Sequence, residues 1–396
     1  MIAGEAPKTG FGDTAWAVVL MAGLFFFNIS SRIVLSPLMP EIEADLQISH
    51  AAAGSLFFLI SVGYFAALLG SGYVAARLLH RSTIVVSAVG VGLALMGMAF
   101  AQSLLALRLS VVVLGAAAGL YLPSAIAALT SIVRPKNWGK AIAVHELAPS
   151  LAFIAVPFAA ELILGGFAWK AVPVVFGACA LLLGIFFARF GRGGRFVGRP
   201  PGLESMKVFL SDPNFWIMTF LFGLGISGTL GLYTMLPLYL VSDYGMVRSD
   251  ANMLLSLSRI SGLFMALIGG WASDRFGAFK TMVVVFLVSG LATVGIGFAP
   301  GRWELAAVFI QPLAAVCFFP AGFAALSAIG PPDSRNIAVS LAVPFGFLIG
   351  GGVVPSLIGF FGDAGSFPQG IALVGAMIGS GALWAGLLQY RSRRSE

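Results

Sequence analysis

Twelve long apolar segments separated by short polar loops constrain this chain more than any other feature of its sequence. A helix that crosses a bilayer needs about 20 predominantly apolar residues, and the segments reach or approach that length. Only 10% of the 396 residues are charged, whereas soluble domains carry about 25% charged residues. The sequence therefore predicts an all-α integral membrane protein. We expect spans near residues 14–38, 51–77, 82–101, 105–132, 139–164, 168–189, 214–241, 250–273, 281–299, 303–329, 336–361 and 367–390.

The longest connection between predicted spans lies at the middle of the chain and is rich in arginine and proline. It predicts a six-helix bundle at residues 1–189, a cytoplasmic linker at 190–213 and a second six-helix bundle at 214–396. Pro123–Ile132 aligns with Pro320–Ile329 at an offset of 197 residues. The second bundle therefore reads as a repeat of the first.

A polar loop after the eighth span carries a short motif with the pattern Gly-x-x-x-Asp-Arg-x-Gly-x-x-Lys. Its residues are Gly270, Asp274, Arg275, Gly277 and Lys280. A related sequence that ends at Arg77 lies 198 residues earlier, with Ala76 in place of the aspartate. The pattern resembles the signature loop of the major facilitator superfamily, which occurs between helices 2 and 3 and again between helices 8 and 9. The resemblance implies twelve transmembrane helices in two pseudo-symmetric six-helix halves, with substrate near the midplane between them and alternating access.

The positions of the basic residues predict the orientation of the chain in the membrane. Lysine and arginine accumulate in one set of alternate loops, which are expected to be cytoplasmic. The other set holds only Arg108, Lys170, Arg248 and Arg302. We therefore expect a multi-pass protein of the bacterial cytoplasmic (inner) membrane with both termini in the cytoplasm. The net charge of +7 then reflects orientation and attraction to membrane lipids, and we expect no nucleic-acid partner.

Arg32 lies inside the first predicted span, where a charge costs about 2.5–3.5 kcal/mol on insertion scales. Asn28, Arg32 and Ser36 are spaced four residues apart, so one face of this apolar helix is polar. The planar guanidinium group matches a carboxylate or phosphate, which makes Arg32 and Asn28 candidates for substrate binding. Alternatively, Arg32 snorkels to the outer surface or pairs with Glu41 in the following loop.

The residues around Arg32 also resemble a particular branch of the superfamily. The pattern Arg32-x-x-Leu-Ser-x-x-x-Pro40-x-Ile-x-x-Asp45-Leu is similar to the first helix and loop of the anion:cation symporters and the neighbouring organophosphate antiporters. In those transporters the corresponding arginine binds the anionic group of the substrate. The resemblance therefore implies an organic anion as the substrate.

Arg259 is the second arginine inside a predicted span. It precedes Asp274 by fifteen residues, which is about 22 Å of helix. In the superfamily this level of helix 8 lines the cavity, so the resemblance makes Arg259 a second candidate for binding the anion. The alternative is a structural pair with a carboxylate of another helix.

His145 and Glu146 lie side by side near the cytoplasmic end of the fifth span. An intramembrane carboxylate beside an imidazole is a candidate proton carrier, and anion binding at the arginines would change its proton affinity. Glu146 could instead pair with Arg32 or Lys140. We expect no metal site, since these residues have no second ligand at helical spacing.

Several spans contain a single side chain with a polar end group that could line the cavity or form a helix-to-helix hydrogen bond. The candidates for substrate binding are Tyr64, Tyr121, Tyr233 and Gln311, with Tyr239 as a further wall residue. The chain lacks the common hydrolase, zinc-protease and nucleotide-loop motifs, so neither an enzyme nor a cofactor is expected.

The sequence predicts a monomeric secondary transporter for a small organic anion, with a carboxylate as the preferred class and symport coupled to protons or Na⁺. A drug or metabolite exporter is the alternative within the transporter class. A non-transporting membrane sensor is the alternative outside it.

Overall fold

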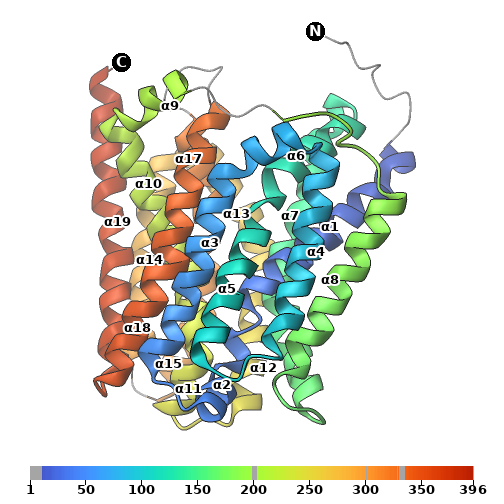
Figure 1. The fold of residues 1–396 in the computed structure, drawn as a ribbon. Coiled ribbons are helices and arrows are strands. Elements are labelled where there is room, and N and C mark those ends of the chain that lie inside the picture. The colour runs from blue at the N-terminus through green and yellow to red at the C-terminus, as the bar shows by residue number, and fades with distance from the viewer. Residues whose placement is uncertain (1–10, 199–202, 300, 328, 330–334, 396) are drawn as a thin grey trace. The chain divides into compact units, whose positions relative to one another are not determined.

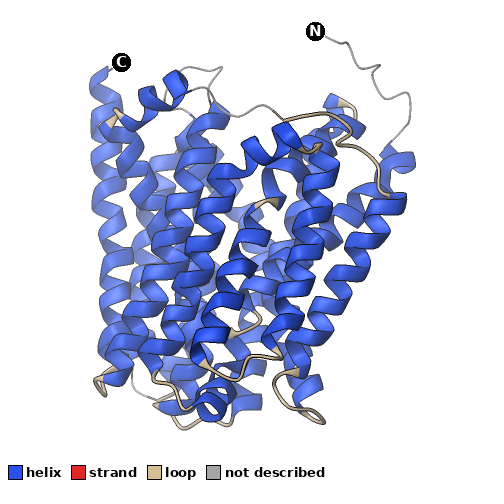
Figure 2. Cartoon of the chain, in the orientation of Figure 1, coloured by secondary structure: helices blue, strands red, loops and turns tan. Residues whose placement is uncertain are grey.

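The computed structural model describes residues 11–198, 203–299, 301–327, 329 and 335–395. These residues form helices joined by short loops and contain no strand (Figure 2). Twelve helices or helix sequences among them are long and apolar enough to cross a membrane. They cover Thr14–Leu46, His50–Arg77, His80–Met98, Leu104–Ile132, Pro135–Leu164, Ala171–Phe190, Pro213–Ser242, Arg248–Phe276, Ala278–Phe298, Arg302–Ser327, Ala338–Asp363 and Phe367–Ser392. The predicted fold class is therefore confirmed.

The chain divides into two compact units, and the first comprises residues 1–34, 63–155 and 163–200. Its described helices lie mainly in the first half of the sequence (Figure 1). They are α1 (Phe11–Ile33), the later part of α3 (His50–Arg77), α4 (His80–Met98), α5 (Leu104–Gly119), α6 (Tyr121–Ile132), η2 (Pro135–Asn137), most of α7 (Trp138–Leu164) and α8 (Ala171–Phe190).

The second unit comprises residues 35–62, 156–162 and 201–396. It combines the second half of the chain with the first part of α3 (residues 50–62) and a short stretch of α7 (residues 156–162). Its other elements are η1 (Ser36–Leu38), α2 (Met39–Leu46), α9 (Leu203–Leu210), α10 (Pro213–Ile226), η3 (Ser227–Gly231), α11 (Leu232–Ser242), α12 (Arg248–Ile260), α13 (Gly262–Phe276), α14 (Ala278–Phe298), α15 (Arg302–Ala315), α16 (Phe318–Ser327), α17 (Arg335–Phe347), η5 (Leu348–Val353), α18 (Val354–Asp363) and α19 (Phe367–Ser395). The predicted boundaries of the two six-helix halves stay a prediction.

One correction concerns the residues after the first span, which the sequence places in a loop. Residues 39–46 form the short helix α2, so Glu41 lies in its first turn. Proline at the start of a helix is compatible with helical geometry because its missing N–H has no intrahelical partner there. Eight residues that include three acidic side chains are too few to show a clear apolar period.

Glycines allow the closest helix crossings within each unit. In the second unit, α14 and α19 run side by side (Figure 1), and Gly375 approaches the backbone of α14 at Val294 and Gly290. In the first unit, Gly92 on α4 faces Gly177 on α8 in the same way. Gly290 and Gly375 each lie 198 residues after their counterparts Gly92 and Gly177. The structure thus reveals a further element of the internal repeat.

Candidate functional site

The side chain of Arg32 is buried in the first unit and stacks on an aromatic ring. Its guanidinium carbon lies 4.2 Å from the centre of the Tyr64 ring on α3, and only 5% of the arginine is exposed. A cation over a tyrosine face is stabilised by the ring quadrupole. The N–H groups of a guanidinium lie in its plane, which is the direction in which it binds a carboxylate.

Arg259 forms the same kind of pair in the second unit. Its guanidinium carbon lies 4.7 Å from the centre of the Tyr233 ring on α11, and 6% of the arginine is exposed. In one unit the arginine comes from the first span and the tyrosine from the second. In the other unit the tyrosine comes from the seventh span and the arginine from the eighth. Each unit therefore holds one buried guanidinium group on a tyrosine face.

Two other predicted substrate-binding residues form helix-to-helix hydrogen bonds. The amide of Asn28 donates to the carbonyl oxygen of Ala118 at 3.0 Å. The amide of Gln311 donates to the carbonyl oxygen of Gly228 at 2.8 Å and contacts Ser289 Oγ at 3.3 Å. These contacts fit the alternative that such polar side chains form hydrogen bonds between helices. Their role in binding substrate stays a prediction.

The predicted proton-carrying residues form a connected chain in the first unit. The buried ring of His145 stacks on Phe25 with ring centres 4.4 Å apart. Its Nδ1 lies 3.1 Å from Glu146 Oε1, and its Nε2 lies 3.3 Å from the Tyr121 hydroxyl. Glu146 is 48% exposed and lies within electrostatic range of Tyr64 and Tyr121. The chain thus connects an accessible carboxylate to a fully buried imidazole.

The hydrogen bonds of this chain extend to the backbone of α1. The Tyr121 hydroxyl donates to the carbonyl oxygen of Met21 at 2.6 Å. The two ring nitrogens of His145 face Tyr121 and Glu146, and the tautomer of the imidazole sets which of these contacts the ring donates to.

The complete signature loop joins α13 to α14. Gly277 has φ 92°, a backbone conformation that side chains other than glycine rarely adopt, so the glycine of the motif has a clear conformational reason. A side chain at Gly270 would meet only Pro320, at 3.9 Å. The charged residues Asp274, Arg275 and Lys280, and Arg77 in the first copy, are all exposed. No ion pair that involves any of these four residues is found among the described residues.

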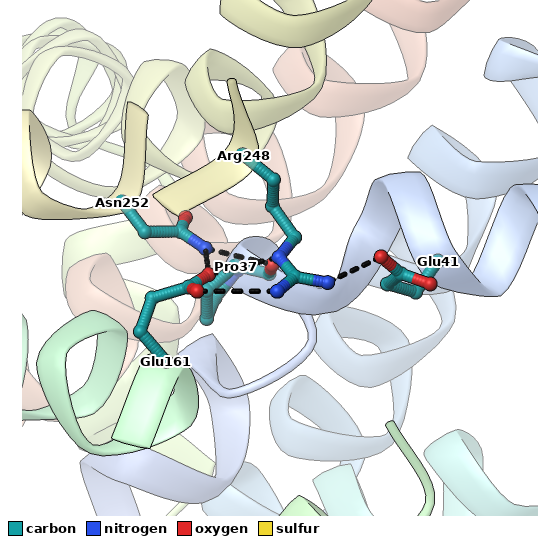
Figure 3. A network of polar contacts seen from close by, with 5 residues as sticks. All are labelled: Pro37, Glu41, Glu161, Arg248 and Asn252. Atoms are coloured by element: carbon teal, nitrogen blue, oxygen red, sulfur yellow. Dashed lines mark hydrogen bonds and ion pairs between the residues drawn. The ribbon is translucent and has the colours of Figure 1, made fainter. Parts of the chain in front are cut away.

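The sequence analysis missed a polar network in the second unit (Figure 3). Arg248, at the start of α12, binds Glu161 on α7 through Nε at 3.0 Å and through Nη2 at 3.2 Å. Its Nη1 donates to Glu41 on α2. Asn252 donates to Glu161 and to the carbonyl oxygen of Pro37, the latter at 3.1 Å. Glu41 therefore pairs with Arg248, a residue of the eighth span.

A second contact joins neighbouring segments within the same unit. The carboxylate of Asp363, at the end of α18, accepts the backbone N–H groups of His50 and Ala51 at 2.7 and 3.1 Å. These groups belong to the first turn of α3, where N–H groups have no intrahelical acceptor. The network and the Asp363 contact together tie α2, α3 and α7 to α12 and α18.

Comparisons with known proteins agree with the fold. The chain is 24% identical over 329 residues to an uncharacterised transporter of the major facilitator type from Bacillus subtilis, covering 82% of this chain and 83% of that protein. It is 26% identical over 136 residues to a probable sulfoacetate transporter from Cupriavidus necator, covering 34% of this chain and 31% of that protein.

Solved structures show the same fold at low sequence identity. A bacterial homologue of the human lysosomal transporter Spinster, in an inward-facing and occupied conformation, matches with a TM-score of 0.82 at 17% identity, covering 97% of this chain and 98% of that chain. A D-xylose–proton symporter matches with a TM-score of 0.79 at 16% identity, covering 95% of this chain and 97% of that chain.

A sequence profile completes the comparison. The profile described as "Major Facilitator Superfamily" matches residues 21–301 and, in a second overlapping alignment, residues 232–396. Together the two alignments include nearly all of the chain. With twelve candidate spans and the signature loop, this chain belongs to the major facilitator superfamily of membrane transporters.

Proposed function

We propose that the protein is a secondary active transporter that moves a small organic anion across the bacterial cytoplasmic membrane by alternating access. Both termini lie in the cytoplasm in this proposal, as the distribution of basic residues favours. The substrate carries a carboxylate or sulfonate group. Arg32 and Arg259 each bind an anionic group of the substrate.

The observation that carries this proposal is the pair of buried arginines stacked on tyrosines. A charge within a membrane span is costly and usually marks a substrate or ion pathway. Arginine keeps its charge under all physiological conditions, so both units carry a permanent buried cation. Such a cation attracts an anionic substrate and repels a cationic drug.

The partial relative from Cupriavidus necator supports the same class of substrate. Its name refers to sulfoacetate, a small molecule with one carboxylate and one sulfonate group. The planar carboxylate and the tetrahedral sulfonate each present two oxygens that a guanidinium binds through two parallel hydrogen bonds. The shared region is short, so the relative supports the chemical class rather than the compound.

A thermal-shift panel on the purified protein tests the substrate class. The panel contains acetate, malonate, sulfoacetate, a neutral sugar and a lipophilic cation. A ligand at 100 times its dissociation constant stabilises the folded state by about 2.7 kcal/mol, so a bound carboxylate or sulfonate should raise the melting temperature. Stabilisation by the cation alone would instead favour a drug exporter. Flux in liposomes that contain only this protein then separates a transporter from a sensor.

We further propose that His145 and Glu146 carry the coupled proton. The contact between His145 Nδ1 and Glu146 Oε1 offers a path for a proton between the two side chains, and the exposed Glu146 can exchange it with solvent. Tyr64 lies within electrostatic range of both Arg32 and Glu146, so an anion bound at Arg32 changes the charge near the carboxylate. Proton symport is therefore the proposed coupling.

Replacing Glu146 with glutamine should uncouple transport from the proton gradient. A gradient of about one pH unit supplies about 1.4 kcal/mol per proton, which supports about tenfold accumulation. Liposomes with the variant should lose this accumulation but retain exchange of internal for external anion, because exchange needs no net proton movement. Glu146→Asp keeps a titratable carboxyl and serves as the matched control. Accumulation by Glu146→Gln at the wild-type level would rule out this carrier.

A further inference from the structure

Arg248 already holds carboxylates in the geometry that an anionic substrate would adopt. Both oxygens of Glu161 face its Nε and Nη2 atoms at 3.0 and 3.2 Å, and Glu41 binds Nη1 (Figure 3). This bidentate fork is the strongest form of carboxylate recognition by arginine. Two carboxylates share one guanidinium, so the three charged groups leave one net negative charge. Removing one carboxylate would still leave Arg248 neutralised.

A line of polar residues runs along α12 from Arg248 to Arg259. Asn252, Ser256 and Arg259 follow Arg248 at intervals of four, four and three residues, so all four lie on one face of the helix. Arg259 lies eleven positions after Arg248, which is about 16 Å along the helix. We call Arg248, Asn252, Ser256 and Arg259 the α12 polar line.

Two members of the α12 polar line have buried polar atoms without a hydrogen-bond partner among the described residues. Asn252 and Ser256 are 0% and 4% exposed. Among the described residues, Asn252 Oδ1 and Ser256 Oγ have no hydrogen-bond partner. An unsatisfied buried polar atom is costly unless another state of the protein supplies a partner. A hydrated anion or its polar substituents would supply it.

We propose that Arg248 is a second anion-binding residue of the transport path, which Glu161 and Glu41 occupy when this end of the protein is closed. The inference rests on the proposed function and on the predicted extracytoplasmic position of Arg248. When α7 and α2 separate from α12, the arriving anion takes the place of the two carboxylates. It then passes along Asn252 and Ser256 toward Arg259.

In this proposal the charge of Arg248 is compensated in both states, because the substrate anion replaces Glu161 and Glu41. Arg248 is neutralised by protein carboxylates in one state and by substrate in the other. The substrate thereby offsets the cost of breaking the fork, which couples anion arrival to opening. The Asp363 contact holds α3 independently, so loss of one carboxylate leaves part of the closure in place.

Variants that break the fork from opposite sides test the proposal. Glu161→Gln and Arg248→Gln both remove the ion pair between Arg248 and Glu161, so a purely structural latch predicts that both variants change the KM in the same direction. The proposal predicts opposite effects on anions. Glu161→Gln should lower the KM for uptake of the anion that the panel identifies, whereas Arg248→Gln should raise it. Arg248→Lys, which keeps the charge but loses the fork, should give an intermediate KM.

A measurement that needs no transport separates this proposal from the proposed function. Ser256→Cys is introduced after Cys179 and Cys317 have been replaced by serine. Anionic and cationic methanethiosulfonates of equal size are then applied from outside. A unit charge about 12 Å away, at an effective dielectric constant of about 20, changes the rate of a charged reagent by about tenfold.

The ratio of anionic to cationic labelling should fall in Arg248→Gln and rise in Glu161→Gln. External sulfoacetate should slow labelling in Glu161→Gln and leave Arg248→Gln unchanged. Equal acceleration of both reagents in both variants, with an unchanged ratio, would show a latch only and overturn the proposal. If the ratios shift as expected but no anion is transported, the proposed function fails while Arg248 remains an anion-attracting residue.

Discussion

Replacing Arg32 with alanine is expected to abolish anion-dependent stabilisation and transport. Truncating one partner of a buried, hydrogen-bonded charge pair costs about 2–5 kcal/mol, which is roughly a 30- to 5,000-fold loss of affinity. Arg32→Lys keeps the charge but loses the planar fork and should recover only part of the affinity. Binding is measured by the thermal shift that the preferred anion produces, and transport by uptake into liposomes.

Variants of Tyr64 separate the contribution of the ring from that of the charge. Tyr64→Phe keeps the aromatic face beneath Arg32 and should bind the anion nearly as well as the wild type. Tyr64→Leu removes the face, and the loss of a cation–π contact of about 0.5–2 kcal/mol should weaken binding by roughly 2- to 30-fold. Equal loss in both variants would assign the effect to the hydroxyl group instead.

The melting temperature without ligand distinguishes binding from a structural role. A buried charge in a membrane span is costly, so Arg32→Ala without ligand should be at least as stable as the wild type if the arginine serves the substrate. The same holds for Arg259→Ala, with Tyr233→Phe as its control. A large loss of stability together with an unchanged response to anions would make these arginines structural pairs.

The sequence was sufficient to predict the fold because apolar length is a local property. Each span needs about 20 apolar residues, and the predicted ends agree with the structure to within a few residues, except after Leu38. There the first membrane-spanning segment continues through α2 to Leu46. This short helix lies within the second unit, where it packs against α11, a contact between distant residues that its own composition does not reveal.

The arginines could be identified as functional candidates because their burial cost is visible in the sequence. Their tyrosine partners could not be assigned, because the sequence does not distinguish Tyr64 and Tyr233 from other isolated polar residues in apolar spans. The Arg248 network depends on residues 207 and 87 positions apart, so no local pattern reveals it. One signal was present, since Arg248 is among the few basic residues predicted on the extracytoplasmic side.

A single methyl group at Gly290 is expected to destabilise the second unit more than changes at neighbouring glycines. A Cβ atom there would lie 2.6 Å from both the Cα and the backbone nitrogen of Gly379 on α19. The obstacle is backbone, so α14 and α19 would have to move apart. Overpacking of this kind costs about 1–3 kcal/mol, measured as the free energy of unfolding in a reversible detergent titration of Gly290→Ala.

The opposite side of the same crossing provides the matched control. A Cβ atom at Gly379 would meet only the Cα of Gly290, at 4.0 Å, and one at Gly386, further along α19, would meet nothing within 4 Å. In these helix interiors alanine is favoured over glycine by roughly 0.5–1 kcal/mol, so Gly379→Ala and Gly386→Ala should be neutral or stabilising. If all three variants behaved alike, helix propensity would govern these positions and the close crossing would contribute nothing. A selective loss of stability in Gly290→Ala would show that the crossing holds the two helices at their separation.

The equivalent position Gly92, whose Cβ atom would lie 2.7 Å from the carbonyl oxygen of Gly177, should then respond in the same way, because the repeat places the same contact between α4 and α8.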